Sequence, residues 1–359
     1  MSKPRVRSFI LVVVAVLVVW PLGSKGVTPL VSDPVRVHYI NVGQADAIFL
    51  EFDKCAVMID AGGEATDNPH EATELVDYLN KVFTRRPDLN RTIHTIIISH
   101  PHLDHTMKLP DVVQTFTVKN LIDGGDSAGS GIGPLKKARE FVSSHGGNHF
   151  AINDDDVKAP GFKNLALDSI HNLDADVEIK LLSGSRGCHN ANNSSLVTLV
   201  TYKGTRFLFT GDAEDLGDTD CSDEITELLD RYKGTTQLRA EVLKVDHHGS
   251  DNGTDDDWMS AIAPKISVIS AGKPDAAHQK PGGFHAFQFG HPRESAVKRI
   301  ESGTTTNRQP PATVITMDAV RRIHQDRIME KAVYCTCWDG NVVVEPGGGG
   351  MVPLVKTNQ

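Results

Sequence analysis

The most informative stretch of this sequence is Ser99-His100-Pro101-His102-Leu103-Asp104-His105. It places three histidines and one aspartate within six residues, and it directly follows an apolar run, Ile93 to Ile98, that is typical of a buried β-strand. Borderline divalent cations prefer imidazole and carboxylate ligands, so a strand that ends in such a loop indicates a metal site. Chance clustering among 16 histidines in 359 residues is the alternative. The segment favours a metal-dependent enzyme.

The length and composition of the chain indicate an ordinary globular protein. Its 359 residues are enough for one large or two ordinary domains with a buried core. The hydrophobic fraction is 39%, the charged fraction is 23%, and the formal net charge is −9. We therefore expect no strong general nucleic-acid-binding surface, because such surfaces depend on clustered lysine and arginine. A local basic track or bound metal ions could still hold a phosphate.

The N-terminus has the order of a targeting segment. Three basic residues precede Phe9 to Trp20, a stretch of twelve residues without a polar side chain, and small residues follow. The apolar part is shorter than the roughly 20 residues that a spanning helix needs. We expect residues 1–30 to be a signal peptide or an N-terminal membrane anchor, with membrane association through residues 9–20. The protein would then be exported, extracellular or periplasmic, or anchored at the membrane by its N-terminus.

The five cysteines allow disulfides in an exported chain, but the odd number leaves at least one unpaired within a monomer. Cys335 and Cys337 alternate along an apparent strand, and there is no second cysteine pair to complete a zinc ribbon. Buried thiols are the expected state of most of the five.

Apolar periodicity predicts an α/β order of elements. Short apolar runs between turn residues indicate strands, and a 3.6-residue period indicates helices. The segment at 106–174 is less legible and is expected to form the substrate-side wall of the site, and 346–359 is expected to be a flexible tail. The expected elements are strands at 35–41, 47–51 and 55–60, a helix at 71–83, a strand at 93–98, a short helix at 136–142, strands at 177–182, 196–202 and 206–210, a helix at 222–232, strands at 241–245 and 266–270, a helix at 295–301, and strands at 314–317 and 332–344.

Three other strand ends repeat the pattern of the opening segment. Asp60 ends an apolar strand, Asp212 ends another, and His247 with His248 follows a third. Each alone is a weak indication, because Asp-Gly turns after strands are common. Four strands that all end in aspartate or histidine predict that their loops meet at one rim and form one site.

With these segments in place, the sequence resembles the metallo-β-lactamase fold superfamily, and within it the hydrolase domain of competence (DNA-uptake) proteins. The resemblance implies an α/β fold, an αββα sandwich of two mixed β-sheets flanked by helices, with residues 31–345 as one hydrolase domain. The matching segments run in the family's order and are Asn41 to Ala47, Ile59 to Gly62, Ser99 to His105, Asn192 to Val197, Thr210 to Asp212, Val242 to Ser250, Phe289 to Pro292, Val333-Tyr334 and Asp339-Gly340.

The resemblance also implies two divalent metal ions. Zinc is the expected ion, with manganese or iron as alternatives, since imidazole-rich sites suit zinc and aspartate-rich sites accept the others. The implied ligands are His100 and His102 for the first ion, Asp104 and His105 for the second, Asp212 for both, and one of His247 and His248 for the second, with His247 preferred.

Further roles follow from the same resemblance. Asp60 is implied to be the carboxylate that orients a ligand histidine, and His291 to be a substrate contact or proton donor. The third-motif histidine of the superfamily has no certain counterpart, because an Asn-x-x-Ser-Leu-Val segment stands there. His189, just before it, is a candidate ligand, and a free loop histidine is the alternative. Competence-type domains often carry aspartate where this chain has His102, and the fuller histidine set favours catalysis.

The implied reaction is hydrolysis by a metal-bound hydroxide at a dinuclear site. Asp104 and Asp212 would hold the hydroxide, and His291 or a metal would stabilise the leaving oxygen. The expected partner is a small-molecule or nucleic-acid substrate, with phosphodiesters or nucleic acid preferred. The alternatives are hydrolysis of esters, lactones or β-lactams, and a non-catalytic module that binds DNA or a cell-envelope partner.

Overall fold

The computed structural model describes residues 35–64, 74–273, 286–318, 320–347 and 351–357. All of them belong to the contact unit that extends from Pro34 to Gln359. The expected signal peptide or anchor at 1–30 lies outside the described residues. Within the described ranges, no helix combines the length and apolar character that are needed to cross a membrane.

The larger of the two main sheets has eight strands in the order β16-β15-β1-β2-β3-β4-β5-β6. Strands β3 to β6 are parallel, and the pairs at the other end are antiparallel. Because parallel strands end at the same edge of a sheet, the loops after β3 and β4 open on one side. The strands are β1 (Arg36–Tyr39), β2 (Ala47–Glu51), β3 (Ala56–Ala61), β4 (Thr92–Ile97), β5 (Thr117–Asp123), β6 (Asn148–Ala151), β15 (Val342–Glu345) and β16 (Leu354–Thr357).

The smaller sheet has six strands in the order β14-β11-β10-β9-β8-β7. Here β9, β10, β11 and β14 are parallel, so the loops after β9 and β10 also open on one side. A separate hairpin joins β12 to β13. The strands are β7 (Val177–Leu181), β8 (Thr198–Tyr202), β9 (Thr205–Phe209), β10 (Val242–Lys244), β11 (Ile266–Ile269), β12 (Asn307–Asp318), β13 (Ile323–Lys331) and β14 (Val333–Cys335).

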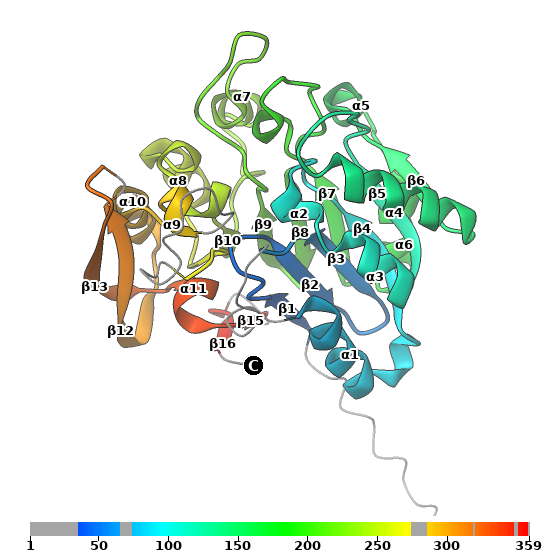
Figure 1. Cartoon of the computed structure of the whole chain (residues 1–359), viewed down its shortest axis with the longest axis horizontal. Helices are drawn as coiled ribbons and strands as arrows, with labels where there is room; N and C mark the ends of the chain where they lie inside the picture. The colour runs from blue at the N-terminus through cyan, green and yellow to red at the C-terminus, as the bar shows by residue number, and fades with distance from the viewer. Residues whose placement is uncertain (1–34, 65–73, 274–285, 319, 348–350, 358–359) are drawn as a thin grey trace, which may run out of the picture. The chain divides into compact units, whose positions relative to one another are not determined.

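The two sheets pack face to face and helices cover their outer faces. Successive side chains of a strand point to opposite faces of its sheet, so each strand contributes to both layers. In β3, Val57 and Ile59 pack between the sheets, whereas Met58 packs against the helices. Figure 1 shows the layers, which confirm the predicted αββα sandwich. The larger sheet is covered by α1 (Leu75–Arg85), α3 (Leu109–Thr115) and α4 (Ile132–Ser144), and the smaller by α7 (Glu224–Arg231), α8 (Asp256–Ile262) and α10 (Glu294–Gly303). Shorter helices are α2 (Leu103–Thr106), α5 (Asp154–Lys158), α6 (Leu165–Leu173), α9 (Ala286–Phe289) and α11 (Thr336–Asp339).

The predicted single strand at 332–344 is wrong. The segment contains β14, then α11, then β15, and the two strands belong to different sheets. The chain turns because the Thr336 hydroxyl donates to the Ala271 carbonyl and Gly340 has a φ of 69°. The expectation of a flexible tail also fails for residues 354–357, which form β16 and pair antiparallel with β15.

The cysteines differ from the expected buried thiols. Cys188 is bonded to Cys221 and Cys335 to Cys337, and Cys55 is a buried free thiol. The second pair forms because the chain leaves the extended conformation at Cys335 instead of continuing as a strand. Disulfide connectivity cannot be deduced from sequence alone, because it depends on which loops the fold brings together.

Candidate metal centre

Four strand ends meet at one edge of the sandwich. Asp60 lies at the end of β3, the histidine segment follows β4, Asp212 follows β9, and the His247-His248 pair follows β10. The parallel directions of these strands in the two sheets place the loops together, as the sequence led us to expect.

A compact group forms around Asp212. One ligand atom from each of Asp104, His105, Asp212 and His248 lies within 4.8 Å of the others. The Asp212 Oδ2 atom is 3.2 Å from His105 Nε2 and 3.4 Å from His248 Nε2. The His248 Nε2 atom is 3.1 Å from Asp104 Oδ2. Two imidazoles and two carboxylates at this spacing could hold one divalent ion.

Backbone and carboxylate acceptors fix the orientation of the two histidines in this group. The Asp60 carboxylate accepts hydrogen bonds from the Ser99 amide and hydroxyl, both at 2.7 Å, and lies 2.8 Å from His105 Nδ1. His248 Nδ1 lies 2.7 Å from the Ser270 carbonyl. When Nδ1 donates to these acceptors, the lone pair of each Nε2 faces the group.

His100 and His102 lie beside the compact group. Their facing nitrogens, His100 Nε2 and His102 Nδ1, are 2.9 Å apart. The His100 Nε2 atom is 3.9 Å from Asp212 Oδ2. Burial lowers the pKa of His100 well below its ordinary value, so the ring is neutral and its lone pair is available to a metal.

His247 does not belong to the compact group, although we expected it there in preference to His248. Its Nε2 atom is 4.0 Å from Asp212 Oδ2, and its Nδ1 atom is 3.0 Å from Glu214 Oε1. His247 and His248 both have left-handed backbones, with φ of 40° and 53°. The two ring centroids are 6.2 Å apart. His247 contacts Glu214, whereas His248 contacts Asp104.

His291 is buried against the histidine pair. Its ring centroid is 5.4 Å from that of His247 and 6.0 Å from that of His248. The Gln44 side-chain nitrogen lies 3.0 Å from His291 Nδ1. Burial lowers the pKa of His291 well below its ordinary value, so the ring is neutral at neutral pH.

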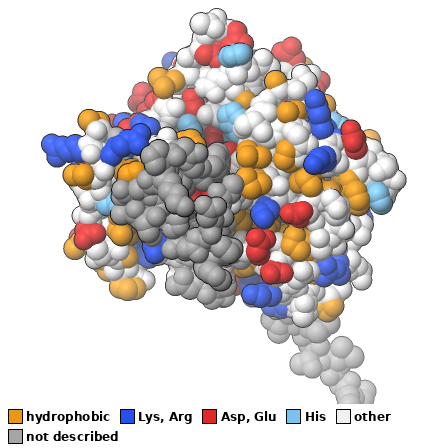
Figure 2. Space-filling model, viewed as in Figure 1, with side chains coloured by type: hydrophobic (Ala, Val, Ile, Leu, Met, Phe, Trp, Pro, Cys, Tyr) orange, Lys and Arg blue, Asp and Glu red, His pale blue; other side chains and the backbone are white. Residues whose placement is uncertain are grey.

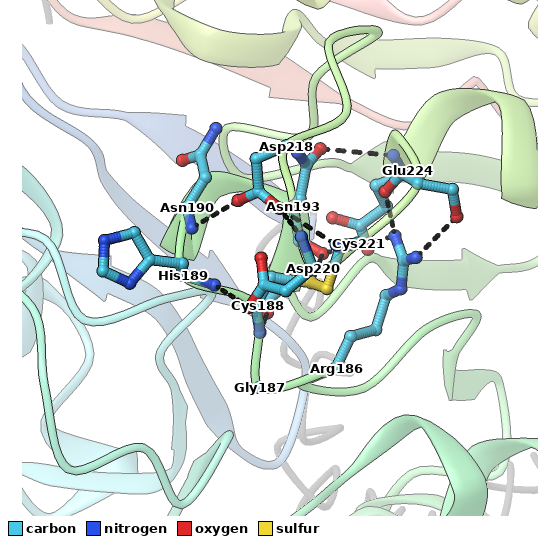
Figure 3. Close-up of a disulfide and its surroundings, with 12 residues drawn as sticks. Arg186, Gly187, Cys188, His189, Asn190, Asn193, Asp218, Asp220, Cys221 and Glu224 are labelled. Atoms are coloured by element: carbon cyan, nitrogen blue, oxygen red, sulfur yellow. Dashed lines mark hydrogen bonds between the residues drawn. A yellow bond between two sulfur atoms is a disulfide. The ribbon is translucent and has the colours of Figure 1, made fainter.

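His189 is not brought to the centre. It is exposed on the loop that holds the Cys188–Cys221 disulfide, and its backbone N–H donates to Asp220 at 2.9 Å. Its side chain points away from the disulfide (Figure 3). Asp218, Asp220 and Cys221 also gather there, but a disulfide-bonded sulfur cannot act as a thiolate ligand.

Two buried charges at the centre were missed from the sequence, Asp46 and Lys244. They form an ion pair, and the Lys244 ammonium donates to the Gly211 carbonyl at 2.8 Å and lies 3.7 Å from Asp212 Oδ1. Burial opposes the charge of Lys244, but Asp46 and Asp212 raise its pKa above the ordinary value. A lysine inside the apolar strand β10 is the signal that could have revealed it.

The centre has the chemistry of a cation site. Despite burial, the charges of Asp212 and Asp104 raise the pKa of His248 to about 10. The buried atoms His105 Nε2 and Asp212 Oδ1 form no hydrogen bond with any described residue. Buried polar atoms ordinarily have partners, so these two fit a metal that would supply the missing interaction.

A cavity of about 1060 Å³ adjoins the centre at His102. Its walls include residues 124–129 after β5, residues 153–155 and the disulfide loop. The two basic residues of the wall, Lys158 and Arg186, are ion-paired with Glu227. Acidic side chains and histidine are exposed together at the top of the face in Figure 2. The acids of the cavity wall that form no ion pair with described residues are Asp126, Asp155 and Asp220.

Comparison with known proteins places this centre in a family. A model of the metallo-beta-lactamase superfamily matches residues 40–273. ComE operon protein 3 of Bacillus subtilis (strain 168) is 25% identical over 268 residues, which are 70% of this chain and 30% of that protein. Competence protein ComA of Neisseria gonorrhoeae is 27% identical over 111 residues, 31% of this chain and 13% of the relative. The matched parts are thus less than a third of either relative.

Two solved structures match this chain at low TM-score and low sequence identity. The metallo-beta-lactamase fold protein YhfI from Bacillus subtilis has a TM-score of 0.43 and 12% identity and covers 76% of this chain and 95% of its own. The short form of human tRNase Z has a TM-score of 0.35 and 18% identity and covers 65% and 91%, respectively.

Proposed function

Because the chain belongs to the metallo-beta-lactamase superfamily, we propose that it is a metal-dependent hydrolase that cleaves phosphodiesters, nucleic acid included. The observation that carries the proposal is the compact group of Asp104, His105, Asp212 and His248, with its unpartnered buried atoms. Zinc is the expected ion, and manganese or iron are the alternatives. When bound, divalent ions polarise the bond under attack and lower the pKa of a water molecule toward neutrality.

The carboxylates of the centre would orient the attacking water. Asp212 Oδ1 has no hydrogen-bond partner among the described residues. Asp104 faces His248 Nε2, whereas the Ser270 carbonyl faces Nδ1 of the same ring. Both carboxylates can accept a proton from a water molecule held between them and the substrate. Lys244 keeps a fixed positive charge under Asp212 and stabilises its ionised form.

His291 would stabilise the leaving oxygen through a hydrogen bond. The Gln44 carbonyl oxygen accepts from the Gly272 amide at 3.3 Å, which orients the Gln44 amide nitrogen toward His291 Nδ1 at 3.0 Å. Nδ1 therefore accepts, and the ring proton resides on Nε2. A neutral imidazole with this tautomer can donate a hydrogen bond to a developing oxyanion.

The substrate class rests on the resemblance to competence proteins and on the suitability of divalent metals for in-line phosphoryl chemistry. The adjoining cavity has a volume suited to a small ligand. Since its unpaired acids repel polyanions, we expect small diesters to be cleaved faster than polynucleotides at low salt.

The test is a substrate panel on protein loaded with zinc, manganese or iron. We expect hydrolysis of bis-p-nitrophenyl phosphate to exceed that of nitrocefin and of a lactone, and to be lost in Asp212→Ala but kept in the surface control Asp230→Ala. If the protein does not cleave diesters but cleaves lactones or nitrocefin rapidly, the proposed substrate class is wrong. If the unmodified protein has no activity on any substrate and Asp212→Ala keeps the same metal content, the protein would instead be a non-catalytic binding module.

We also propose that the protein is exported or anchored at the membrane by its N-terminus. The order of residues 1–30 supports this, and so do the disulfides Cys188–Cys221 and Cys335–Cys337, because disulfides persist in oxidising compartments. Cell fractionation with thiol labelling tests it. Cytosolic protein with four additional reactive thiols after unfolding would refute export.

A further inference from the structure

One ligand is missing from the first metal site. The compact group already provides four ligands for one ion, which completes a tetrahedral set. His100 and His102 remain beside it and share Asp212, which gives a second ion three ligands. His189 lies elsewhere, exposed on the disulfide loop.

We propose that His247 is the fourth ligand of the first metal site, so that His247 and His248 serve different ions. The distance from His247 Nε2 to Asp212 Oδ2, 4.0 Å, nearly equals the 3.9 Å from His100 Nε2 to the same oxygen. Ligand atoms on one tetrahedral zinc ion are about 3.3 Å apart when each bond is about 2.0–2.1 Å. Each of the two nitrogens is therefore less than an ångström farther from Asp212 Oδ2 than two ligand atoms of one ion would be.

Glu214 positions the ring of His247. This carboxylate is 4% exposed, and its Oε1 atom lies 3.0 Å from His247 Nδ1, which also has Asn252 Oδ1 at 3.1 Å. Only acceptors face Nδ1, so Nδ1 carries the proton and Nε2 presents its lone pair toward Asp212. A carboxylate behind a ligand histidine is a common device of metal sites, because it fixes the tautomer and the ring direction.

The loop that lacks a ligand histidine holds Glu214 instead. The Asn190 side-chain amide donates to Glu214 Oε2 at 3.0 Å, and the Asn192 amide donates to Oε1. Figure 3 shows how this loop is fixed: Cys188 is bonded to Cys221, and the Asn190 backbone N–H donates to Asp218 at 2.8 Å. The loop thus contributes to the first site through Glu214 and His247, without a ligand of its own.

The backbone conformation directs the side chains of His247 and His248 in different directions. Non-glycine residues rarely adopt the left-handed region, and such strain is concentrated at functional sites. His247 and His248 adopt this conformation in succession. The result is that one ring faces Glu214 and Asp212 while the other faces Ser270 and Asp104.

Metal content and cobalt spectra of the full chain test the proposal. The inference rests on the metal centre of the proposed function, but these measurements do not depend on catalysis. Apo protein is titrated with Co²⁺ and Zn²⁺, and bound ions per chain are measured after desalting. We expect two ions per chain in the unmodified protein and in the matched control His189→Ala, but one in His247→Ala. The ion that remains should have the absorption bands of the compact group, and His248→Ala should lose these bands.

Glu214→Gln serves as the milder variant if His247→Ala fails to fold. It should still take up two ions at saturation but bind the first-site ion 10- to 100-fold more weakly, as expected for loss of an orienting carboxylate. Two ions of unchanged affinity in His247→Ala, loss of one ion in His189→Ala, or a single ion in the unmodified protein would each overturn the proposal. Absence of diester hydrolysis with two ions bound would instead refute only the proposed activity.

Discussion

Two buried carboxylates, Glu51 and Asp212, differ in how their charges are balanced. Glu51 accepts hydrogen bonds from Arg85 and Arg86, each with an Nη1 distance of 2.9 Å, and lies 3.2 Å from His38 Nε2. Burial opposes its ionisation, but these partners hold the pKa of Glu51 well below its usual range. Around Asp212, Lys244 at 3.7 Å is shared with Asp46, and Asp212 Oδ1 forms no hydrogen bond with a described residue.

The difference separates a structural charge from a functional one. A buried acid whose oxygens all have donors stabilises the fold without any ligand, whereas an acid with an unpartnered oxygen beside histidine and carboxylate ligand atoms can be stabilised by a bound cation. Glu51 therefore needs only the protein, whereas Asp212 has the surroundings that the proposed metal centre requires. Substitutions at the two positions should have opposite consequences for activity and stability.

The largest effect is expected for Asp212→Ala. Loss of a ligand shared by both ions should reduce kcat/KM for the diester about 1000-fold, since metal catalysis supplies several kcal/mol and each 1.36 kcal/mol is a factor of ten. Full diester activity in this variant would contradict the role of Asp212.

Glu51→Gln should do the reverse. Removal of one charge leaves the buried Arg86, the half-buried Arg36 and the more exposed Arg85 around a neutral group, so the free energy of unfolding should fall by about 3–5 kcal/mol. The metal content and kcat of the folded variant should not change. Denaturant unfolding at constant metal measures the first quantity, and a loss of bound metal would mean that the two regions are not independent.

Asp60→Asn changes an acid of the centre that contacts a ligand histidine and is not a ligand itself. Asp60 contacts His105 Nδ1 and not the candidate ion, so its loss should weaken metal affinity 10- to 100-fold while the number of ions at saturation stays the same. Competition with a chelator dye measures the affinity. Thr92→Val, a change at the half-buried first residue of β4, is the control. Equal affinities in both variants would refute the orienting role.

The smallest effect concerns a third buried acid, Glu224, which has hydrogen-bond donors but forms no ion pair with any described residue. Burial raises the pKa of Glu224 to about 8, although the Ser183 hydroxyl and the Ser195 amide donate to it. The folded protein then binds a proton that the unfolded chain releases near pH 4.5, so stability decreases as pH rises from about 5 to 8, on the order of 1 kcal/mol per pH unit. Glu224→Gln should flatten this slope in chemical unfolding between pH 5 and 8. An identical slope in both proteins would contradict it.

The sequence was informative wherever a strand ended in an aspartate or histidine. Apolar runs located β2 and β4, and the order of motifs identified the sandwich and the residues around Asp212, because strand direction brings those ends together. The choice between His247 and His248 could not be made, since it depends on two left-handed φ angles that no pattern encodes. Lys244 was missed because a lysine in a strand is ordinarily exposed. Helices α3, α5 and α6 lie in a segment with mixed periodicity, and β13 is largely exposed, so neither gave a clear apolar pattern.

The segment from β14 through α11 to β15 connects the two main sheets of the protein. The chain leaves the smaller sheet at Cys335, passes through α11, and enters the larger sheet at Val342, where β15 lies between β1 and β16. A chain cut at residue 332 would take a strand from both sheets at once and leave β1 as an unprotected edge, and exposed edges of apolar strands promote aggregation. The two sheets should therefore unfold as one cooperative unit whose integrity depends on β14, β15 and β16.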